Sequence, residues 1–560
     1  MTRWILAVVA AAGWFGSAQA QSTTEPITGA EVPCVDGAAA GFSCDGVTLL
    51  SFLPIAGLGG STLVIDTLVF PVTVNDVWGW TDPESGREYA LVGRSDGTAF
   101  VEVTDPVHAV FLGLLPSHDL IAGGAKRIQI ESSGSSDVDP VLQDGIGQRV
   151  FKTGYAWHDD KGVGIWRDIK VYENFAFVVA DATPNHGVQV FDLTQLRAVE
   201  APPVVFEETA HYDGMGSAHN IAINEETGFA YVVGSNGEEG CGGGLHMVDI
   251  SDPLNPVFSG CFADVTTGRA QTGYTHDVQC VIYRGPDAEH AGKEICFGSN
   301  ETALSVADVT DKLRPVAIST GSYPDAEYIH QGWLTDDHRY FYQDDELDES
   351  TYGFATRTII WDLEDLEEPR VLGMYHGTTQ AIDHNQYVVG DRLFQSNYKA
   401  GLRILDISTR DAPAEVGYFD TYPAADNRGF EGSWSNYPFF ESGVVLVSSI
   451  REGLFVVRPA ERTPVAVDRD ELPTLFALTG AFPNPFRGAT RLGVRMEQTG
   501  QLRITVHDVL GREVREIHDG LLSAGSHDVT FDASGLSSGT YLIRAQGAAG
   551  ARSVVVTLLN

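Results

Sequence analysis

The sequence predicts an all-β protein, a seven-bladed β-propeller followed by a small C-terminal immunoglobulin-like β-sandwich. The first observation behind this prediction is a phrase of four short strands that recurs seven times along the chain. Apart from the first step, the first strands open every 47 to 57 residues. Four short strands per unit at such a period are typical of propeller blades. The second observation is a change of texture near residue 475, after which short strands alternate with Gly- and Ser-containing turns.

The end of the third strand identifies each repeat most clearly, because it carries an aspartate next to hydrophobic residues. The first repeat ends Val101-Glu102-Val103-Thr104-Asp105-Pro106, the next five have Asp192, Asp249, Asp308, Asp362 and Asp406 at this step, and the seventh is degenerate. An insertion around residues 114–165 separates the first repeat from the second. Since one four-stranded sheet cannot bury both of its faces, we expect the repeats to stack around an axis.

The last repeat stops after its third strand, at Arg458-Pro459, whereas residues 47–54 have the character of a fourth strand. We expect this early segment to close the ring as the outer strand of the last blade, because an open sheet edge favours aggregation. The predicted domains are a signal peptide (1–20), an N-terminal segment with the closing strand (21–73), the propeller (74–459), a linker (460–475) and the sandwich (476–560).

The charge of the chain excludes one class of partner. The 560 residues include 76 acidic and 36 basic side chains, a formal net charge of -40. A protein that binds nucleic acid needs a basic surface for the phosphates, so no nucleic-acid partner is expected. An anionic membrane surface is disfavoured for the same reason, and we interpret most of the acidity as a source of solubility.

The first twenty residues and the cysteines both indicate export. Arg3, an apolar run over residues 5–15 and Ala18-Gln19-Ala20 make up a secretory signal peptide with its cleavage site. No later segment has the ~18 apolar residues of a transmembrane helix. The six cysteines form three sequence-local pairs, for which we predict the disulfides Cys34–Cys44, Cys241–Cys261 and Cys280–Cys296.

Four motifs follow one another in the C-terminal segment, at residues 483–485, 506–512, 522–527 and 535–541. They read Pro-Asn-Pro, Val-His-Asp-Val-Leu-Gly-Arg, Leu-Ser-Ala-Gly-Ser-His and Gly-Leu-Ser-Ser-Gly-Thr-Tyr. With these motifs the segment resembles the type A C-terminal sorting domain of the type IX secretion system. The resemblance implies that the chain crosses the periplasm and reaches the cell surface or the medium, with the type IX machinery as a partner. The alternative is an immunoglobulin-like spacer domain.

The repeats resemble those of the choice-of-anchor B family, which carry a Leu-Val-Ile-Val-Asp-like step. The matching phrases lie at residues 75–83, 89–97, 166–172 and 186–193, within a match that spans about residues 44–459. The insertion between the first two repeats departs from the family pattern. The resemblance implies a propeller body and supplies no reaction, so it assigns no catalytic residue.

Polar residues at the starts of the first strands are the candidate site. First strands line the axis of a propeller, so their starting residues should converge on one rim. Those residues are Asn75, Arg167, His219, His276, His330, His384 and Glu431, followed at the next position by Asp76, Asp168 and Asp277 among others. The candidate ligand-binding residues are thus His219, His276, His330, His384, Glu431, Arg167, Asp168, Asp76 and Asp277, of which the four histidines could hold a divalent metal.

Two interpretations of this rim stay open. The side chains could bind a ligand, or they could hydrogen-bond within their own blades and serve only the architecture. No nucleophile motif, zinc-protease motif or P-loop occurs, so we favour an exported binding or scaffold module with an unknown protein, glycan or small-molecule ligand. The alternative is a metal-dependent hydrolase or lyase. The acidic run Asp344-Asp345-Glu346-Leu347-Asp348-Glu349 lacks a calcium-loop pattern, and we interpret it as a solvated charge run.

Overall fold

The structure, a computed structural model, describes residues 25–65, 68–118, 166–237, 240–460, 476–482, 484, 486–496, 499–508, 512–547 and 550–559. The chain divides into two compact units, Met1–Ala460 and Glu461–Asn560. The predicted signal peptide, most of the predicted linker and most of the insertion lie outside the described residues.

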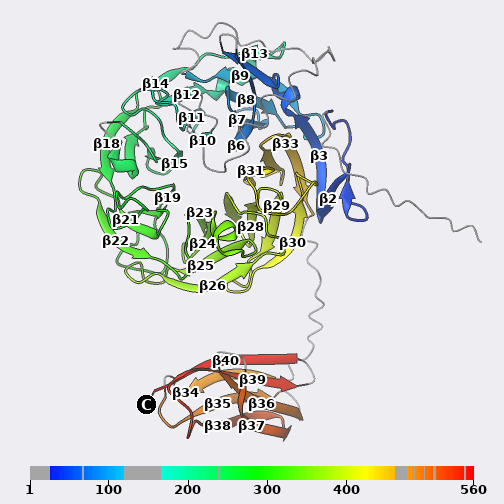
Figure 1. Ribbon diagram of the computed structural model, residues 1–560, viewed down its shortest axis with the longest axis vertical. Helices are drawn as coiled ribbons and strands as arrows, with labels where there is room; N and C mark the ends of the chain where they lie inside the picture. Colours follow the sequence, from blue (N-terminus) through cyan, green and yellow to red (C-terminus); the bar gives the residue numbers. More distant parts are fainter. Residues whose placement is uncertain are drawn as a thin grey trace, which may run out of the picture. The chain divides into compact units, whose positions relative to one another are not determined.

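The described part of the first unit forms seven sheets of four to six strands, which surround a common centre (Figure 1). We call these sheets blades 1 to 7, in the order of their innermost strands. Blade 1 contains β6 (Val74–Thr81), β7 (Glu88–Arg94), β8 (Gly97–Glu102), β9 (Val110–Pro116) and β13 (Val204–Val205). Blade 2 contains β10 (Arg167–Tyr172), β11 (Phe175–Ala180), β12 (Val188–Asp192) and β14 (Ala210–Tyr212). Blade 3 contains β15 (Asn220–Asn224), β16 (Phe229–Val233), β17 (Leu245–Asp249) and β18 (Val257–Phe262).

The next three blades repeat the same antiparallel order. Blade 4 contains β19 (Asp277–Ile282), β20 (Glu294–Ser299), β21 (Leu304–Asp308) and β22 (Val316–Gly321). Blade 5 contains β23 (Ile329–Leu334), β24 (Tyr340–Asp345), β25 (Arg357–Asp362) and β26 (Arg370–His376). Blade 6 contains β27 (Gln386–Val389), β28 (Arg392–Ser396), β29 (Leu402–Asp406) and β30 (Ala414–Phe419), extended by β2 (Phe42–Asp45) and β1 (Ala38–Ala39).

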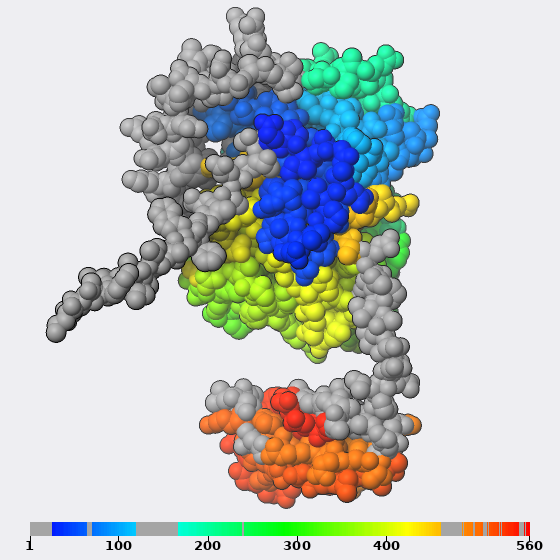
Figure 2. Space-filling model, turned by 90° about the vertical axis from the view of Figure 1, so that its right-hand side faces the viewer, coloured from blue at the N-terminus to red at the C-terminus, as the bar shows by residue number. Residues whose placement is uncertain are grey.

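Blade 7 combines strands from the two ends of the first unit. Its members are β31 (Ser433–Tyr437), β32 (Val445–Ser449), β33 (Gly453–Pro459) and β3 (Val47–Pro54), with β3 at the outer edge. The early segment therefore occupies the place that the sequence predicts for a ring-closing strand. Phe52 of β3 is fully buried and lies 4.4 Å from Phe455 of β33, between ring centroids. The N-terminal segment, blue in Figure 2, lies on the outer surface beside the yellow strands.

The connections carry short elements, which are η1 (Ile55–Leu58), η3 (Leu193–Ala198), η4 (Cys241–Gly243), α3 (Asp348–Tyr352) and the hairpin of β4 (Thr62–Ile65) and β5 (Leu68–Pro71). None of the helices among the described residues has the length and apolar character needed to cross a membrane.

The recurring aspartate has the same structural role in successive blades. At the end of the third strand its carboxylate accepts a hydrogen bond from the backbone N–H two residues later, as Asp249 does from Ser251 at 2.9 Å and Asp406 from Ser408 at 2.8 Å. Such Asx turns are a preferred use of aspartate. The hydrophobic residue that follows the aspartate is buried. Ile250 is an example, and its backbone N–H donates to the carbonyl of Gly228 in the turn between the first two strands of the blade. The aspartate of the repeat signature thus stabilises the turn after the third strand.

All three predicted disulfides are confirmed. The Cα–Cα distances are 5.9 Å for Cys34–Cys44, 5.3 Å for Cys241–Cys261 and 4.1 Å for Cys280–Cys296. The last pair is short because the two cysteines lie directly opposite each other on β19 and β20, the first two strands of blade 4. Cys44 lies in β2, so the first disulfide ties the N-terminal segment to the edge of blade 6.

The second unit consists of two antiparallel sheets. One has the order β34 (Phe476–Phe482), β35 (Ala489–Met496) and β38 (Gly525–Asp532). The other has the order β37 (Glu513–Leu522), β36 (Gly500–Asp508), β39 (Gly539–Gly547) and β40 (Gly550–Leu558). Leu492 and Phe531 of the first sheet share one hydrophobic core with Ile504 and Ile543 of the second. The all-β prediction is confirmed, and the immunoglobulin-like topology of this unit stays a prediction.

Candidate functional site

The first strands of the blades contact one another in ring order around the centre in Figure 1. Polar side chains at their second positions hold these strands together. Asp76 accepts a hydrogen bond from Ile169 N of blade 2 at 3.1 Å, and Asp168 accepts one from Ile221 N of blade 3 at 2.7 Å. Gln331 bonds Gln386 N of blade 6 in the same way, at 3.0 Å. These contacts favour the architectural interpretation for this second layer of residues.

Residues at or near the starts of six first strands build a row of aromatic and imidazole rings that we call the axial collar. Its members, in spatial order, are Trp166, Trp434, His384, His330, His276 and His219. Neighbouring ring centroids lie 4.2–4.4 Å apart: 4.3 Å for the two tryptophans, 4.3 Å for Trp434–His384, 4.4 Å for His384–His330 and 4.2 Å for the last two pairs. Six blades thus contribute one ring each, and the four histidines of the predicted rim lie side by side.

Every histidine of the axial collar uses its Nδ1 atom for a protein contact. Nδ1 of His276 donates to the carbonyl of His330 at 3.1 Å, and Nδ1 of His384 donates to the carbonyl of Trp434 at 2.6 Å. Carboxylates take this role for the other two, Asp344 for His330 at 3.2 Å and Asp181 for His219 at 2.9 Å. Within the described part of the chain, no Nε2 atom of the four forms a hydrogen bond. An Nδ1–H donor fixes the tautomer that leaves a lone pair on Nε2.

Burial and neighbouring charges set the protonation of the collar. Burial lowers the pKa of His384 to about 3 and holds the pKa of His276 and of His330 well below the usual value, with a further lowering by the other histidines for these two. Burial also disfavours the charged form of His219, but the hydrogen bond and charge of Asp181 raise its pKa. The collar therefore combines three imidazoles whose neutral form is favoured with His219, whose pKa is raised by Asp181.

Two histidines of the collar and the nearby Glu346 form a set of three possible metal-ligand side chains. One nitrogen each from His330 and His384 and one carboxylate oxygen of Glu346 all lie within 4.8 Å of one another. The distance from His384 Nε2 to Glu346 Oε1 is 3.9 Å, and the hydroxyl of Tyr398 donates to the same oxygen at 2.7 Å. Two neutral imidazoles with one carboxylate suit zinc and related divalent metals. The Asp344 and Trp434 contacts to Nδ1 are the outer contacts that orient histidine ligands.

Glu346 was missed in the sequence because the acidic run was interpreted as solvated. That interpretation is wrong, since Asp344, Asp345, Asp348 and Glu349 are fully buried in the structure. Burial raises the pKa of Glu346 to about 7, although the Tyr398 hydroxyl opposes the rise. One feature of the sequence indicated that this run approaches the site. Asp344 lies at the end of a second strand, where polar side chains of other repeats also reach the rim.

The remaining predicted residues have other partners. Glu431 does not follow His384 in the collar, because β31 begins two residues later and Trp434 takes that place; Glu431 instead pairs with Lys399 at 3.1 Å. The guanidinium of Arg167 donates to the carbonyl of Arg94 at 2.7 Å. Asp277 is half-buried by area, and burial together with the charge of Asp168 raises its pKa to about 7.

Aromatic side chains fill the axis at another level of the inner strands. Phe439, from the loop after β31, lies 5.7–5.9 Å from Trp78 of blade 1, Trp333 of blade 5 and Tyr387 of blade 6, between ring centroids. Lys170 lies 4.5 Å above the Trp78 ring and pairs with Asp168 at 2.5 Å. These ring contacts join blades 1, 5, 6 and 7 at this level.

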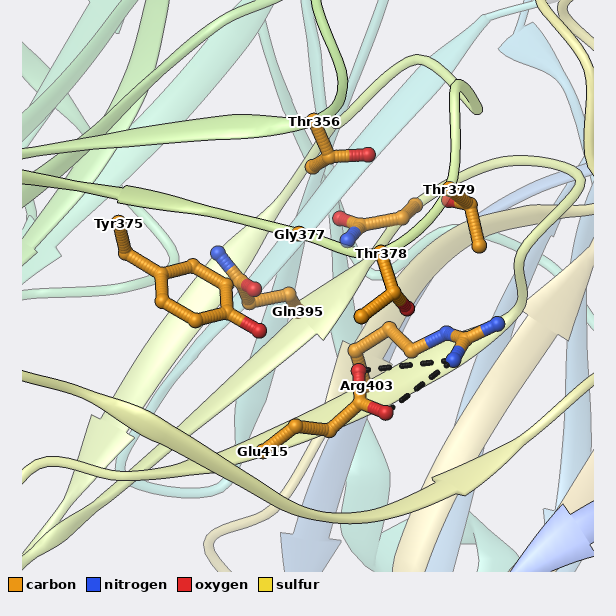
Figure 3. A pocket seen from close by; sticks show the side chains of 9 residues that line it. Thr356, Tyr375, Gly377, Thr378, Thr379, Gln395, Arg403 and Glu415 are labelled. Carbon is orange, nitrogen blue, oxygen red and sulfur yellow. Dashed lines mark hydrogen bonds and ion pairs between the residues drawn. The ribbon is translucent and has the colours of Figure 1, made fainter.

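Two other places were candidates. A small hollow between blades 5 and 6, with a cavity volume of about 10 Å³, is lined by Tyr375, Thr378 and the Arg403–Glu415 ion pair, which Figure 3 shows. It does not include a collar residue. Asp287, His290 and Glu367 also lie within metal-binding distance of one another. There, Asp287 already accepts backbone N–H groups of Glu289 and Leu366, so this group ties two loops together.

Comparisons with known proteins match the two parts of the chain separately. Residues 480–557 match the secretion system C-terminal sorting domain, and residues 163–183, 215–264 and 389–421 match the LVIVD repeat. None of the curated proteins matches the sequence.

Solved structures resemble the chain at low identity. PorZ, an essential surface component of the type IX secretion system of Porphyromonas gingivalis, is 11% identical with a TM-score of 0.39, over 85% of this chain and 58% of PorZ. The extracellular domain of BT4673 from B. thetaiotaomicron is 11% identical with a TM-score of 0.41, over 91% of this chain and 57% of that one. A Lactobacillus plantarum protein is 9% identical with a TM-score of 0.40, over 82% and 99%. The chain thus spans just over half the length of the first two.

The sorting domain marks proteins that the type IX system exports to the cell surface or the medium, and the three disulfides suit such a compartment. The protein is therefore an exported β-propeller protein that carries LVIVD repeats and a type IX secretion C-terminal sorting domain.

Proposed function

We propose that the propeller is an extracellular binding module whose site is the axial collar, with a divalent transition metal held by His330, His384 and Glu346. The observation that carries this proposal is the convergence of these three side chains from two blades within 4.8 Å. Nδ1 of each histidine is engaged by a neighbour, so the Nε2 lone pairs are the atoms left for a ligand.

The protonation of the site supports the proposal. A metal ligand must be deprotonated, and burial keeps the pKa of His330 and of His384 below the usual histidine value. Three protein ligands leave at least one coordination position for an outside group, such as a carboxylate or hydroxyl of a protein, glycan or small molecule. Trp434 lies against His384 and would offer an apolar face beside that position.

The experiment is a metal titration of the full mature protein. After removal of bound metal by chelation, we expect Co²⁺ to produce visible absorption bands at one equivalent per chain, and Zn²⁺ to displace it. Glu346→Gln keeps an acceptor for the Tyr398 hydroxyl but removes the charge, and should weaken binding by roughly 10–100-fold or more.

The matched control is His290→Gln, because His290 belongs to the second group of possible metal ligands. This variant should bind Co²⁺ as the unaltered protein does. Loss of the cobalt bands in His290→Gln, with binding intact in Glu346→Gln, would place the metal at the wrong site and defeat the proposal. Hydrolysis of model esters by the zinc-loaded protein would favour an enzyme over a binding module.

A further inference from the structure

The disulfide between Cys241 and Cys261 lies at the outer edge of blade 3. Cys261 is in β18, the outermost strand of that blade (Figure 1), and Cys241 opens the short element η4. All six cysteines belong to the described part of the chain, and among them only Cys261 is exposed, whereas both partners of Cys280–Cys296 are buried. An exposed disulfide is reduced more easily than a buried structural one, because a thiol must reach a sulfur atom to attack it.

An imidazole lies against this disulfide. His246 of β17 is directly opposite Cys261 in the β17–β18 ladder, and its Nδ1 atom is 3.7 Å from Sγ of Cys241. Since a disulfide sulfur can only accept, this hydrogen bond requires a proton on Nδ1, and Nε2 of the neutral ring then accepts from the hydroxyl of Tyr212 at 2.8 Å. His246 is 0% exposed, so the contact is shielded from solvent. The ring is thus placed to stabilise negative charge on Sγ of Cys241.

The backbone at Cys241 also favours opening of the disulfide. Cys241 has φ +53°, in the left-handed region that L side chains rarely adopt, and Gly242 and Gly243 follow with φ +67° and +85°. The disulfide to β18 helps to hold Cys241 in this conformation, so breaking it releases an unfavourable backbone angle. Strain of this kind gathers at functional sites.

We infer that Cys241–Cys261 is a site of thiol–disulfide exchange, at which an external thiol attacks Cys261 and Cys241 leaves beside His246. The incoming thiolate forms a bond to Sγ of Cys261, the Cys241–Cys261 bond breaks, and its electron pair leaves on Sγ of Cys241, which takes up a proton. A second thiol then attacks the mixed disulfide and releases Cys261 as a thiol. Two electrons and two protons pass from the two external thiols to the pair, and those thiols become a disulfide.

The co-substrate is a thiol, either a small one such as glutathione or the dithiol of an exported oxidoreductase. Within the described residues, β18 has no strand on its outer side, and Val257 and Phe258 at its start are exposed. An open edge can pair with the backbone of an extended segment of another protein. This edge therefore favours a protein dithiol, which could hold its reactive thiol beside Cys261.

Exchange at this disulfide reaches the start of blade 4. The carbonyl of Gly243 in η4 accepts the backbone N–H groups of Gly234 and Thr275, both at 3.0 Å. Thr275 directly precedes His276 of the axial collar. Reduction frees η4 from β18 and should loosen these two hydrogen bonds. The inference does not depend on metal binding at the collar, because neither the disulfide nor its imidazole neighbour belongs to that site.

The test is reduction of the full mature protein in glutathione buffers and, separately, by reduced thioredoxin, followed by alkylation and mass spectrometry of each cysteine. We expect Cys241 and Cys261 to be alkylated under conditions in which the other four cysteines stay oxidised, and the glutathione adduct to lie on Cys261. A larger second-order rate constant with thioredoxin identifies a protein dithiol as the co-substrate, and a larger one with glutathione identifies a small thiol. Deuterium uptake at the Thr275 amide should rise after reduction, and unchanged uptake would overturn the link to the collar.

His246→Phe keeps a ring against Phe258 but removes the donor to Cys241. It should slow reduction by about tenfold or more, as expected for the loss of one hydrogen bond to a charged group. The matched control is His108→Phe, at a histidine whose side chain is 60% exposed, and it should leave the rate unchanged.

Two results with the unaltered protein would overturn the inference without any variant. One is reduction of Cys241–Cys261 no sooner than the other two pairs, and the other is a glutathione adduct on Cys241 instead of Cys261. A folded His246→Phe protein that is reduced at the unaltered rate would overturn the role of the imidazole.

Discussion

The ring-closing strand gives the sharpest test of how the propeller is held together. Phe52 of β3 is 0% exposed and packs against Phe455 of β33 and Phe42 of β2, with ring centroids 4.4 and 5.9 Å away. Phe52→Ala removes a large buried ring at the point where the two ends of the first unit meet. Substitutions of this kind cost about 3–5 kcal/mol of unfolding free energy, of which each aromatic pair accounts for about 0.5–1.5 kcal/mol.

The assay is urea unfolding of the mature protein followed by intrinsic fluorescence, with the size of the native species measured in parallel. We expect the first transition to move to lower urea by an amount that corresponds to at least 3 kcal/mol. Loosening of β3 would also bare the edge of β33, so concentration-dependent association should increase. Leu313→Ala, at an 81% exposed position, should change stability by no more than about 0.5 kcal/mol. A loss below about 1 kcal/mol for Phe52→Ala would refute this account of closure.

Three further predictions concern one disulfide, the pH dependence of stability and the role of the sorting domain in export. Replacing Cys280 and Cys296 by serine opens a loop with a sequence separation of 16 and should cost about 3 kcal/mol, measured by urea unfolding without reductant; an unchanged midpoint would contradict it. Burial would raise the pKa of Asp82, but hydrogen bonds from Arg197 and Ser85 lower it to about 2, so this group adds stability above pH ~4 that is lost as the pH falls toward 2. The stability gap between the unaltered protein and Arg197→Gln should therefore narrow over that range in acid unfolding. Deleting residues 476–560 should leave a folded propeller in the periplasm, and normal recovery at the cell surface or in the medium would disprove it.

Much of the fold was predictable because a blade is built from neighbours in sequence. Strand alternation, the turn aspartates and the spacing of the repeats depend on contacts within about fifty residues, and the pattern of each repeat encodes them. The cysteine pairs are also local, so their proximity followed from sequence distance. The export signal was predictable from the ordered motifs of the C-terminal segment.

The candidate site was predictable only in part. The four histidines were identified from their register, because first strands must converge on the axis of a propeller. The register did not predict that Trp434, and not Glu431, lies next to His384 in the collar. That depends on where β31 begins after a loop. Register alone also could not distinguish His330 and His384, which approach Glu346, from His219, which pairs with Asp181.

The sequence by itself determined the all-β class, the repeats, the disulfide pairs and the export address, since each depends on local pattern or on a short ordered motif. Only the tertiary structure decided that the acidic run is buried and that Glu346 within it approaches His330 and His384. The physical reason is that the solvation of a carboxylate depends on what the neighbouring blade places against it. The packing of two blades brings together residues that are far apart in the sequence, and the repeat pattern does not predict these contacts.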